Sequence, residues 1–394
     1  MTIQLSEKMG RLGTESAFDV LAKAEALAAT GRSVINLGIG QPDFKTPPNV
    51  VEAAVKALRD GHHGYTPSPG ILPLREAIAE DIAQHRGVDV SPDNIAVVPG
   101  GTVTMFFAIL MFGEPGVEIM YPNPGFPIYE SVINFSGAKA VPIPLLEKND
   151  FSFDAEATLA SITPQTRLII INSPANPTGG AVPKAEMDKL VAGLEKHPHV
   201  AILSDEIYDR MTYDGRKHVS MLNYPEISDR LILLNGWSKT YAMTGWRLGY
   251  GIWPSSIVGD AIRLCINCHS CVNAATQWAG IEAIRGPQDN VTTMVEAFDR
   301  RRGVIVDGLN ALPGVTCRTP GGAFYTFPNI TGTGMTSHEF QDRALEECGI
   351  ATIAGTSFGS YGEGYVRFSY ANSVENIQTA LQRLEEMLKA KVTA

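Results

Sequence analysis

The stretch NGWSKTYAMTGWRLGY, residues 235–250, contains a lysine and, eight positions later, an arginine among mostly small and apolar residues. It follows a short apolar run, residues 231–234, that predicts a buried strand. Lysine is expensive to bury and commonly faces water. Lys239 is therefore either an ordinary solvated loop residue or an amine held at a strand end for chemistry, and the rest of the chain must distinguish these interpretations.

Further apolar runs are also followed by polar residues. The runs NIAVVPGG, GVEIMYP, RLIIINSP, VAILSDE, RLILLNG and RLGYGIWP predict buried strands, and amphipathic segments such as 183–197 lie between several of them. Near-continuous apolar strands separated by helices indicate a mostly parallel sheet covered on both faces. Ligands of such sheets bind beyond the carboxyl ends of the strands, so the residues that follow each run are candidates for a site.

These candidates share a place at one predicted edge of the sheet. They are Gly100, Gly101, Thr102, Asn172, Asn176, Asp205, Tyr208, Ser238 and Lys239, with Arg247 nearby. Each also has an ordinary interpretation as a turn residue, a helix N-cap or a loop residue. Their joint placement is harder to explain in that way and favours a common site.

The chemistry of the set suits one kind of cofactor. Glycines before a predicted helix let the backbone approach an anion, although a simple glycine turn is the alternative. A phosphate cradle, a lysine and an aspartate together fit pyridoxal phosphate, which needs a lysine for its Schiff base and an acidic partner for its ring nitrogen. The sequence patterns of the P-loop and of dinucleotide-binding folds do not occur at these positions.

Composition limits the remaining classes of function. The chain has 394 residues, of which 44% are hydrophobic and 19% charged, and a formal net charge of −10. This length predicts two or three packed units, and the acidic balance without a basic cluster argues against nucleic-acid binding. The N-terminus does not resemble a secretory signal, and the longest apolar run, residues 105–112, is too short for a membrane span. We therefore expect a cytoplasmic protein with no membrane partner.

The segment CINCHSC places Cys265, Cys268 and Cys271 at regular spacing around His269. A metal or iron–sulfur site is one interpretation. The alternative is a set of neighbours on a helix, since a spacing of three returns to the same helix face and cysteine tolerates burial. We favour the helical interpretation and predict no metal.

The pattern changes after residue 290, where helical segments mix with a few strands, as in GGAFYTFPNI and GYVRFSY. Such mixing indicates a smaller α+β unit, with which the helix predicted from AFDVLAKAEALAAT packs. The predicted division is a large domain at 46–289 and a small domain formed by 1–45 and 290–394.

With these residues assembled, the chain resembles the class I/II aminotransferases of fold type I, the branch with aspartate, alanine and aromatic enzymes. The motifs that carry the resemblance are GYTPSPGILPLREAIA, NPTGG, SDEIYD, SKTYAMTGWRLGY and VRFS, in the order typical of that family. The resemblance extends from INLGIGQPDF to GYVRFSYANS. It implies an α/β fold with a mostly parallel large domain, a smaller α+β domain, pyridoxal phosphate as cofactor, and a homodimer with shared active sites.

The resemblance also implies roles for individual residues. Lys239 matches the Schiff-base lysine, Asp205 the partner of the ring nitrogen, and Tyr208 and Asn176 the partners of the ring hydroxyl. The remaining matches are Gly101, Thr102, Ser238 and Arg247 at the phosphate, Phe126 on the ring face, Tyr65 at the partner subunit's phosphate, Arg367 at the substrate α-carboxylate, and Gly40 beside it. One position departs from the pattern, because Gly236 stands where the family often has a hydroxyl residue.

The implied reaction moves an amino group from an L-amino acid to a 2-oxo acid in two half-reactions, with freed Lys239 as the general acid and base at the substrate Cα. The amino donor stays open, because no second cation for a distal carboxylate can be assigned and Glu15 would oppose one. The alternatives are a C–S lyase that uses the same lysine for β-elimination, and a catalytically silent regulator with the same fold.

Overall fold

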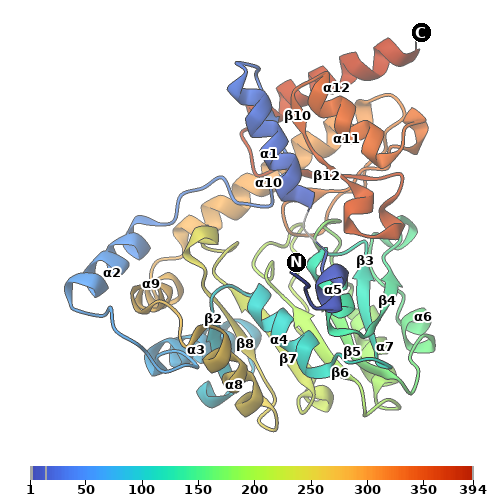
Figure 1. Ribbon diagram of the computed structural model, residues 1–394. Helices are drawn as coiled ribbons and strands as arrows, with labels where there is room; N and C mark the ends of the chain where they lie inside the picture. Colours follow the sequence, from blue (N-terminus) through green and yellow to red (C-terminus); the bar gives the residue numbers. More distant parts are fainter. Residues whose placement is uncertain (1–2, 14–15, 393–394) are drawn as a thin grey trace.

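The computed structural model describes residues 3–13 and 16–392 (Figure 1). Its centre is a seven-stranded sheet with the strand order β2-β8-β7-β6-β5-β3-β4. The strands are β2 (Ile95–Val98), β3 (Glu118–Asn123), β4 (Lys139–Pro144), β5 (Thr166–Asn172), β6 (Ala201–Asp205), β7 (Leu231–Gly236) and β8 (Gly249–Ile252). All neighbours pair in parallel except β8, which is antiparallel to β2 and β7. The fold is therefore α/β with a mostly parallel sheet, as predicted.

Helices cover both faces of this sheet because its strands are apolar on both sides. Leu168 and Ile170 of β5 belong to a buried cluster with α4 (Thr102–Phe112), α5 (Ile128–Ser136) and α8 (Val258–His269). Ile169 and Ile171 face the other way, toward α7 (Lys184–Leu194). Successive side chains of a strand point to opposite faces, so a strand covered on both sides is continuously apolar.

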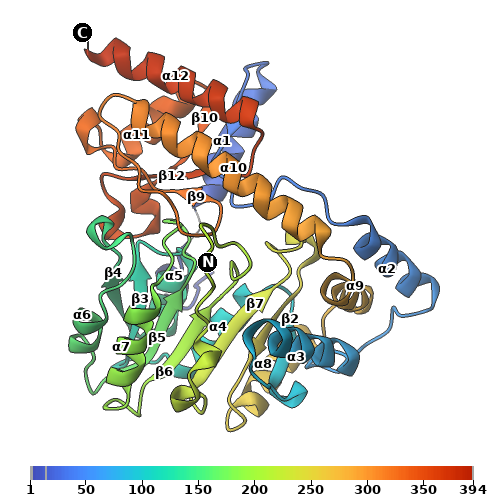
Figure 2. The same cartoon turned by 180° about the vertical axis from the view of Figure 1, so that it is seen from behind.

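A second group of elements packs above the carboxyl edge of the large sheet. It contains a three-stranded antiparallel sheet, β11-β12-β9, and a parallel pair, β1-β10. These strands are β1 (Ile35–Asn36), β9 (Tyr325–Thr326), β10 (Ile350–Ala351), β11 (Ile353–Ala354) and β12 (Val366–Ser369). The surrounding helices are α1 (Ser16–Ala29), α10 (Asp289–Ala311), α11 (Ser337–Glu346) and α12 (Val374–Val392). Figure 2 shows α10 passing from the region of α9 (Ala274–Arg285) to pack alongside α12.

The remaining helices lie at the two sides of the large sheet, with α2, α3 and α9 at the side of β2 and α6 at the side of β4 (Figure 1). The helix α2 (Pro48–Arg59) packs against α9, and α9 also contacts α3 (Leu72–Arg86). The helix α6 (Ala155–Ala160) packs against α7. No helix within the described residues is long and apolar enough to cross a membrane.

Most predicted elements are confirmed, and the exceptions have a local cause. All six apolar runs form strands, β2, β3, β5, β6, β7 and β8. The edge strand β4 was not predicted, because Lys139–Pro144 contains two prolines and is mostly half-exposed. Proline cannot donate to a sheet and is tolerated at an edge. The predicted strand in GGAFYTFPNI is confined to Tyr325–Thr326.

Candidate active site

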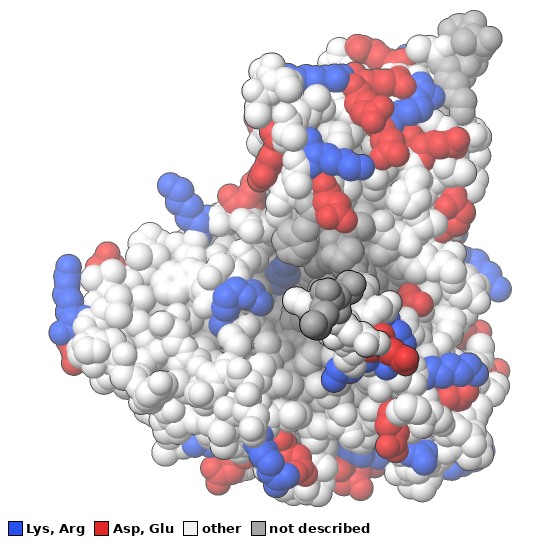
Figure 3. All heavy atoms as spheres, in the orientation of Figure 1, with Lys and Arg blue, Asp and Glu red and all other residues white. Residues whose placement is uncertain are grey.

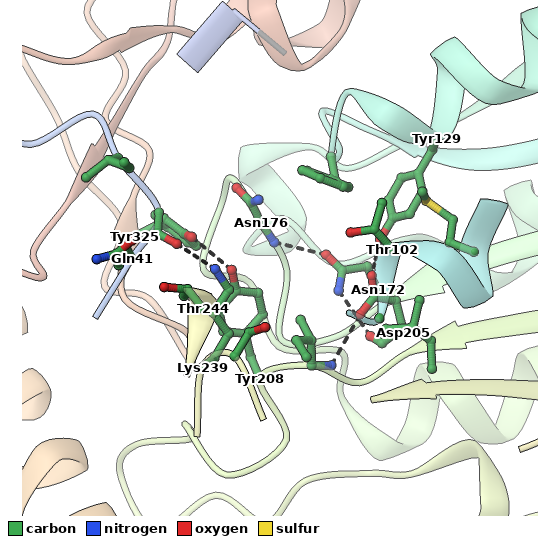
Figure 4. A pocket seen from close by; sticks show the side chains of 18 of the residues that line it. Gln41, Thr102, Tyr129, Asn172, Asn176, Asp205, Tyr208, Lys239, Thr244 and Tyr325 are labelled. Atoms are coloured by element: carbon green, nitrogen blue, oxygen red, sulfur yellow. Dashed lines mark hydrogen bonds between the residues drawn. The ribbon is translucent and has the colours of Figure 1, made fainter. Parts of the chain in front are cut away.

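A cavity of about 530 Å³ opens at the carboxyl edge of the central sheet, below the smaller sheet. Its lining contains every site residue implied by the family resemblance except Tyr65: Gly40, Gly101, Thr102, Phe126, Asn176, Asp205, Tyr208, Ser238, Lys239, Arg247 and Arg367. Asn172 also lines the cavity, whereas Gly100 does not. These residues come from segments that extend from position 40 to position 367 of the chain. Figure 4 shows Lys239, Tyr208 and Tyr325 grouped on one side of the cavity and Asp205, Asn172 and Tyr129 on the other.

Asp205 is the last residue of β6, and its carboxylate is almost fully buried. The hydroxyl of Tyr129 donates to its Oδ2 at 2.6 Å, and the backbone N–H of Ile207 donates to its Oδ1 at 3.2 Å. The side chain of Asn172, on the neighbouring strand, donates to its backbone carbonyl at 3.0 Å. Burial raises the pKa of Asp205 to about 6, against the effect of these two hydrogen bonds to the carboxylate. The cavity therefore holds a carboxylate whose ionised form lacks a full set of protein partners.

Lys239 lies three residues beyond the end of β7 and is half-buried. Its ammonium group donates to the backbone carbonyl of Gly40 and lies 5.9 Å from the centre of the Phe324 ring. It also lowers the pKa of Asp205 through its charge. Lys239 therefore faces the cavity and is not an ordinary solvated loop residue.

The close approach of Arg247 requires a glycine at position 100, just after β2. Gly100 has a positive φ of 94°, and a Cβ atom there would lie 2.1 Å from Nη2 of Arg247. Gly101 follows, and α4 begins at Thr102, so that the N-terminal end of this helix lies at the cavity. Arg247 itself adopts a left-handed backbone conformation and donates to the carbonyl of Thr244 at 2.8 Å. Backbone donors and a guanidinium together form an anion-binding corner.

Arg367 is fully buried in β12 and lines the cavity. Its Nη1 donates to the side-chain oxygen of Asn176 at 2.8 Å, and its Nη2 donates to the carbonyl of Gly38. Its Nε has no hydrogen-bond partner among the described residues. The guanidinium lies 4.7 Å from the ring centre of Tyr325 and 4.6 Å from that of Phe358. A buried cation whose partners are neutral oxygens is suited to receive a carboxylate.

Two tyrosines of the cavity were missed by the sequence analysis. Tyr129 is the second residue of α5, three positions after Phe126, and Tyr325 lies in β9 with its hydroxyl 2.8 Å from that of Tyr208. The spacing of three between Phe126 and Tyr129 was a usable signal, because residues three apart at the start of a helix can contact each other, as these two rings do. No local signal marks Tyr325, because its partner lies 117 residues earlier in the chain.

The departure at Gly236 has a structural explanation. Gly236 ends β7 and pairs directly with Gly249 of β8. A Cβ atom at Gly236 would lie 2.9 Å from both the Cα of Gly249 and the backbone oxygen of Leu248. A serine at this position would therefore require the backbone of β8 to move.

Tyr65 does not contribute to the cavity of its own chain. It lies in the loop between α2 and α3 and is 94% exposed. The predicted contact with a partner subunit stays a prediction.

The three cysteines of CINCHSC do not converge on a common point. Cys265 is buried in α8, Cys268 is exposed on the same helix, and Cys271 lies beyond the helix end at His269. Burial raises the pKa of the Cys265 thiol to about 12. Within the described part of the chain, no group of three His, Cys, Asp or Glu side chains is arranged to hold a metal ion.

Comparison with known proteins assigns the family. The family described as aminotransferase class I and II matches residues 32–384. The aspartate aminotransferase of Pyrococcus horikoshii is 40% identical over 366 residues, which cover 92% of this chain and 93% of that protein. The aromatic-amino-acid aminotransferase 2 of Thermococcus litoralis is 37% identical, over 93% of this chain and 94% of that protein.

Solved structures show the same relationship. The aspartate aminotransferase of Rhizobium meliloti is similar with a TM-score of 0.94 and 34% identity, over 98% of this chain and 99% of its own. The aromatic aminotransferase of Pyrococcus horikoshii gives a TM-score of 0.89 at 35% identity, over 94% and 100% of the two chains. This chain belongs to the class I and II aminotransferases. It is a transaminase of the pyridoxal-phosphate-dependent kind.

The buried carboxylate generates a prediction about stability. The pKa of Asp205 is about 6 in the folded protein, against an ordinary 3.8. Folding therefore favours the protonated carboxyl group. Its contribution to the free energy of unfolding is fully present below pH 4 and is lost as the pH rises through 6. The corresponding destabilisation at pH 8 is about 3 kcal/mol. In protein freed of bound ligand, Asp205→Asn should therefore melt at a higher temperature than wild type at pH 8.

Melting curves between pH 4 and 8 measure this effect. The advantage of Asp205→Asn should shrink as the pH falls below 6. The matched control is Asp307→Asn, which removes an exposed carboxylate of α10. Its melting temperature should stay close to that of wild type at each pH. A gain for Asp205→Asn that does not change with pH would contradict an ionised, poorly compensated carboxylate.

Proposed function

We propose that this chain binds pyridoxal phosphate in the cavity through Lys239, Asp205 and the corner formed by Gly101, Thr102 and Arg247. The observation that carries the proposal is that an amine, a buried carboxylate and an anion-binding corner line one cavity. The groups present fit each end of this cofactor. Ser238 adds a hydroxyl donor next to Lys239, and the apolar side chains of Phe126 and Ile207 line the cavity beside Asp205.

When bound, the cofactor supplies a carbonyl that carries the amino group and a ring that accepts electrons. The carboxylate of Asp205 holds a proton at the ring nitrogen, because an ionised buried carboxylate favours a neighbouring cation. Asn176 and Tyr208 orient the ring oxygen. The amine of Lys239 moves the proton at the substrate Cα, acting as general base and then as general acid.

Arg367 orients the substrate in this proposal. Its guanidinium donates to the α-carboxylate that amino acids and 2-oxo acids share. Asn176 and the carbonyl of Gly38, which accept hydrogen bonds from the same guanidinium, hold it in place. Gly40 keeps this region open, since a Cβ atom there would lie 2.3 Å from the hydroxyl of Tyr325. The donor is an L-amino acid whose side chain stays unassigned between aspartate, aromatic and neutral types. Glu15, which bears on that choice, lies outside the described residues.

We also propose a cytoplasmic homodimer and the two-domain division at residues 46 and 289. The exposure of Tyr65, and that of Arg247 within the anion-binding corner, support a partner that completes the site. The pairing of β1 with β10 supports the assignment of residues 1–45 to the small domain. The start of α10 at Asp289 supports the second boundary.

The role of Lys239 is tested by chemical labelling. Borohydride reduction in the presence of pyridoxal phosphate, followed by peptide mapping, should place the label on Lys239. Lys239→Ala should lose transamination and the label while it retains its fold by circular dichroism. A label on another lysine with Lys239 unmodified is incompatible with the proposal.

The role of Arg367 is tested by Arg367→Lys, which keeps the charge but loses the planar fork. Loss of a charged hydrogen bond corresponds to about 1.5–3 kcal/mol, so kcat/KM should fall about ten- to a hundredfold for every amino donor. The matched control is Arg285→Lys, which alters a surface ion pair with Glu80 and should change kcat/KM little. A fall confined to acidic donors would move Arg367 to side-chain recognition.

Shared active sites are tested by mixing two inactive variants. Tyr65→Phe is expected to weaken the partner's site, and Lys239→Ala to inactivate its own. After subunit exchange, one site of each hybrid dimer carries both intact residues, so the activity of the mixture should exceed the sum of its components. Exchange without recovered activity, for a Tyr65 variant that is itself severely impaired, would argue against a shared site.

A further inference from the structure

Tyr129 contacts two different groups of the cavity at once. Its hydroxyl donates to Oδ2 of Asp205 at 2.6 Å. The edge of its ring meets the ring of Phe126, with centroids 5.7 Å apart and planes at 83°. Figure 4 shows Tyr129 reaching from its helix toward Asp205. One side chain thus touches both the proposed partner of the ring nitrogen and the proposed ring-stacking residue.

The position of Tyr129 is fixed by its surroundings. It lies in the first turn of α5, directly after Pro127 and Ile128, and it is completely buried. It belongs to the buried cluster that includes Leu203 of β6 and Leu234 of β7. Close packing of this kind restricts a side chain to one rotamer, so the hydroxyl is held at Asp205 and is not free to rotate away.

We propose that Tyr129 is a positioning residue for the cofactor ring, which keeps the Asp205 carboxylate ionised and aimed into the cavity and supports the ring of Phe126 from the side. This inference rests on the proposed function, because it assumes that Asp205 faces the ring nitrogen. It extends that function by one residue, which acts through two others and does not itself react.

The charges around Asp205 explain why a donor is needed there. Burial favours the neutral acid, and the neighbouring charge of Glu206 raises the pKa further. Three groups oppose them: the hydroxyl of Tyr129 on α5, the N–H of Ile207, and the ammonium of Lys239 beyond β7. The ammonium is also a reacting group in the proposed mechanism, so its support changes during turnover. Tyr129 and the N–H of Ile207 are the supports that persist.

Tyr129 can act as a donor throughout the working pH range. Burial and the charge of Asp205 raise the pKa of its hydroxyl well above the ordinary value of 10. The phenol therefore stays protonated and donates one charge-assisted hydrogen bond to the carboxylate. Donation to Oδ2 leaves lone pairs on both carboxylate oxygens for a ligand.

Binding of two probes to the purified protein tests the proposal without measuring activity. One probe is pyridoxal phosphate, and the other is its analogue in which CH replaces the ring nitrogen. Wild type should prefer pyridoxal phosphate, because only that probe can pair with Asp205. In Tyr129→Phe this preference should fall about tenfold, the size expected for one hydrogen bond to a charged group.

Three matched variants separate the contributions. Asp205→Asn should abolish the preference, which tests the proposed function itself. Phe126→Leu should weaken both probes equally, because Phe126 contacts the ring face. Tyr213→Phe removes another buried hydroxyl, which donates to the Ala323 carbonyl outside the cavity lining, and should leave the preference unchanged. Melting curves of each variant establish that it is folded.

The outcomes distinguish the two claims. A preference that collapses in Asp205→Asn but persists in Tyr129→Phe would overturn the role of Tyr129 and leave the proposed function intact. Equal binding of both probes by wild type would overturn the proposed role of Asp205. Tyr129→Phe should lower the preference in the wild-type background and should have no further effect in the Asp205→Asn background. This result would support action through the carboxylate, because coupled residues give non-additive effects.

Discussion

Burial of the Asp205 carboxylate is unfavourable on its own, and much of the cavity is arranged around that single charge. Ionised groups are rarely buried unless they are paired or hydrogen-bonded. Here β6 ends in Asp205 at the same edge where β5 ends in Asn172 and β7 leads to Lys239. The hydroxyl of Tyr129 and the N–H of Ile207 donate to the carboxylate and the charge of Lys239 acts on it, yet its pKa remains at about 6 because burial outweighs these effects. In the proposed function, a cationic ring nitrogen would supply the remaining compensation, so that binding and catalysis would share one physical origin.

The cations of the cavity come from distant parts of the chain and connect its two packed units. Lys239 follows the central sheet and donates to Gly40 in the N-terminal segment. Arg367 belongs to β12 and donates to Asn176 beyond β5. Figure 3 shows basic and acidic side chains interspersed over the outer face of the molecule, whereas within the cavity lining the cations are Lys239, Arg247 and Arg367 and the carboxylate is Asp205. Three cations and one carboxylate therefore line a single cavity, which suits a ligand that carries both anionic groups and a cation.

Much of the large sheet and of the site could be predicted from sequence, because both depend on local pattern. Strands buried on two faces are continuously apolar, and the carboxyl ends of parallel strands meet at one edge, so Asp205 and Lys239 could be placed together before any coordinates. The antiparallel β8 could not be oriented in this way, since an apolar run carries no direction. The proline-containing β4 lacked the apolar pattern altogether. Tyr129 and Tyr325 were missed because their significance lies in hydrogen bonds to residues 76 and 117 positions away.

The central claim is that the buried carboxylate of Asp205 keeps a proton on the ring nitrogen of the bound cofactor. Solid-state nitrogen-15 NMR measures this directly, with pyridoxal phosphate labelled at its ring nitrogen and bound to the protein at pH 7.5. We predict the chemical shift of a protonated pyridinium in wild type and a shift toward that of neutral pyridine in Asp205→Asn. A neutral-pyridine shift in wild type, or a pyridinium shift that persists in Asp205→Asn, would contradict the account.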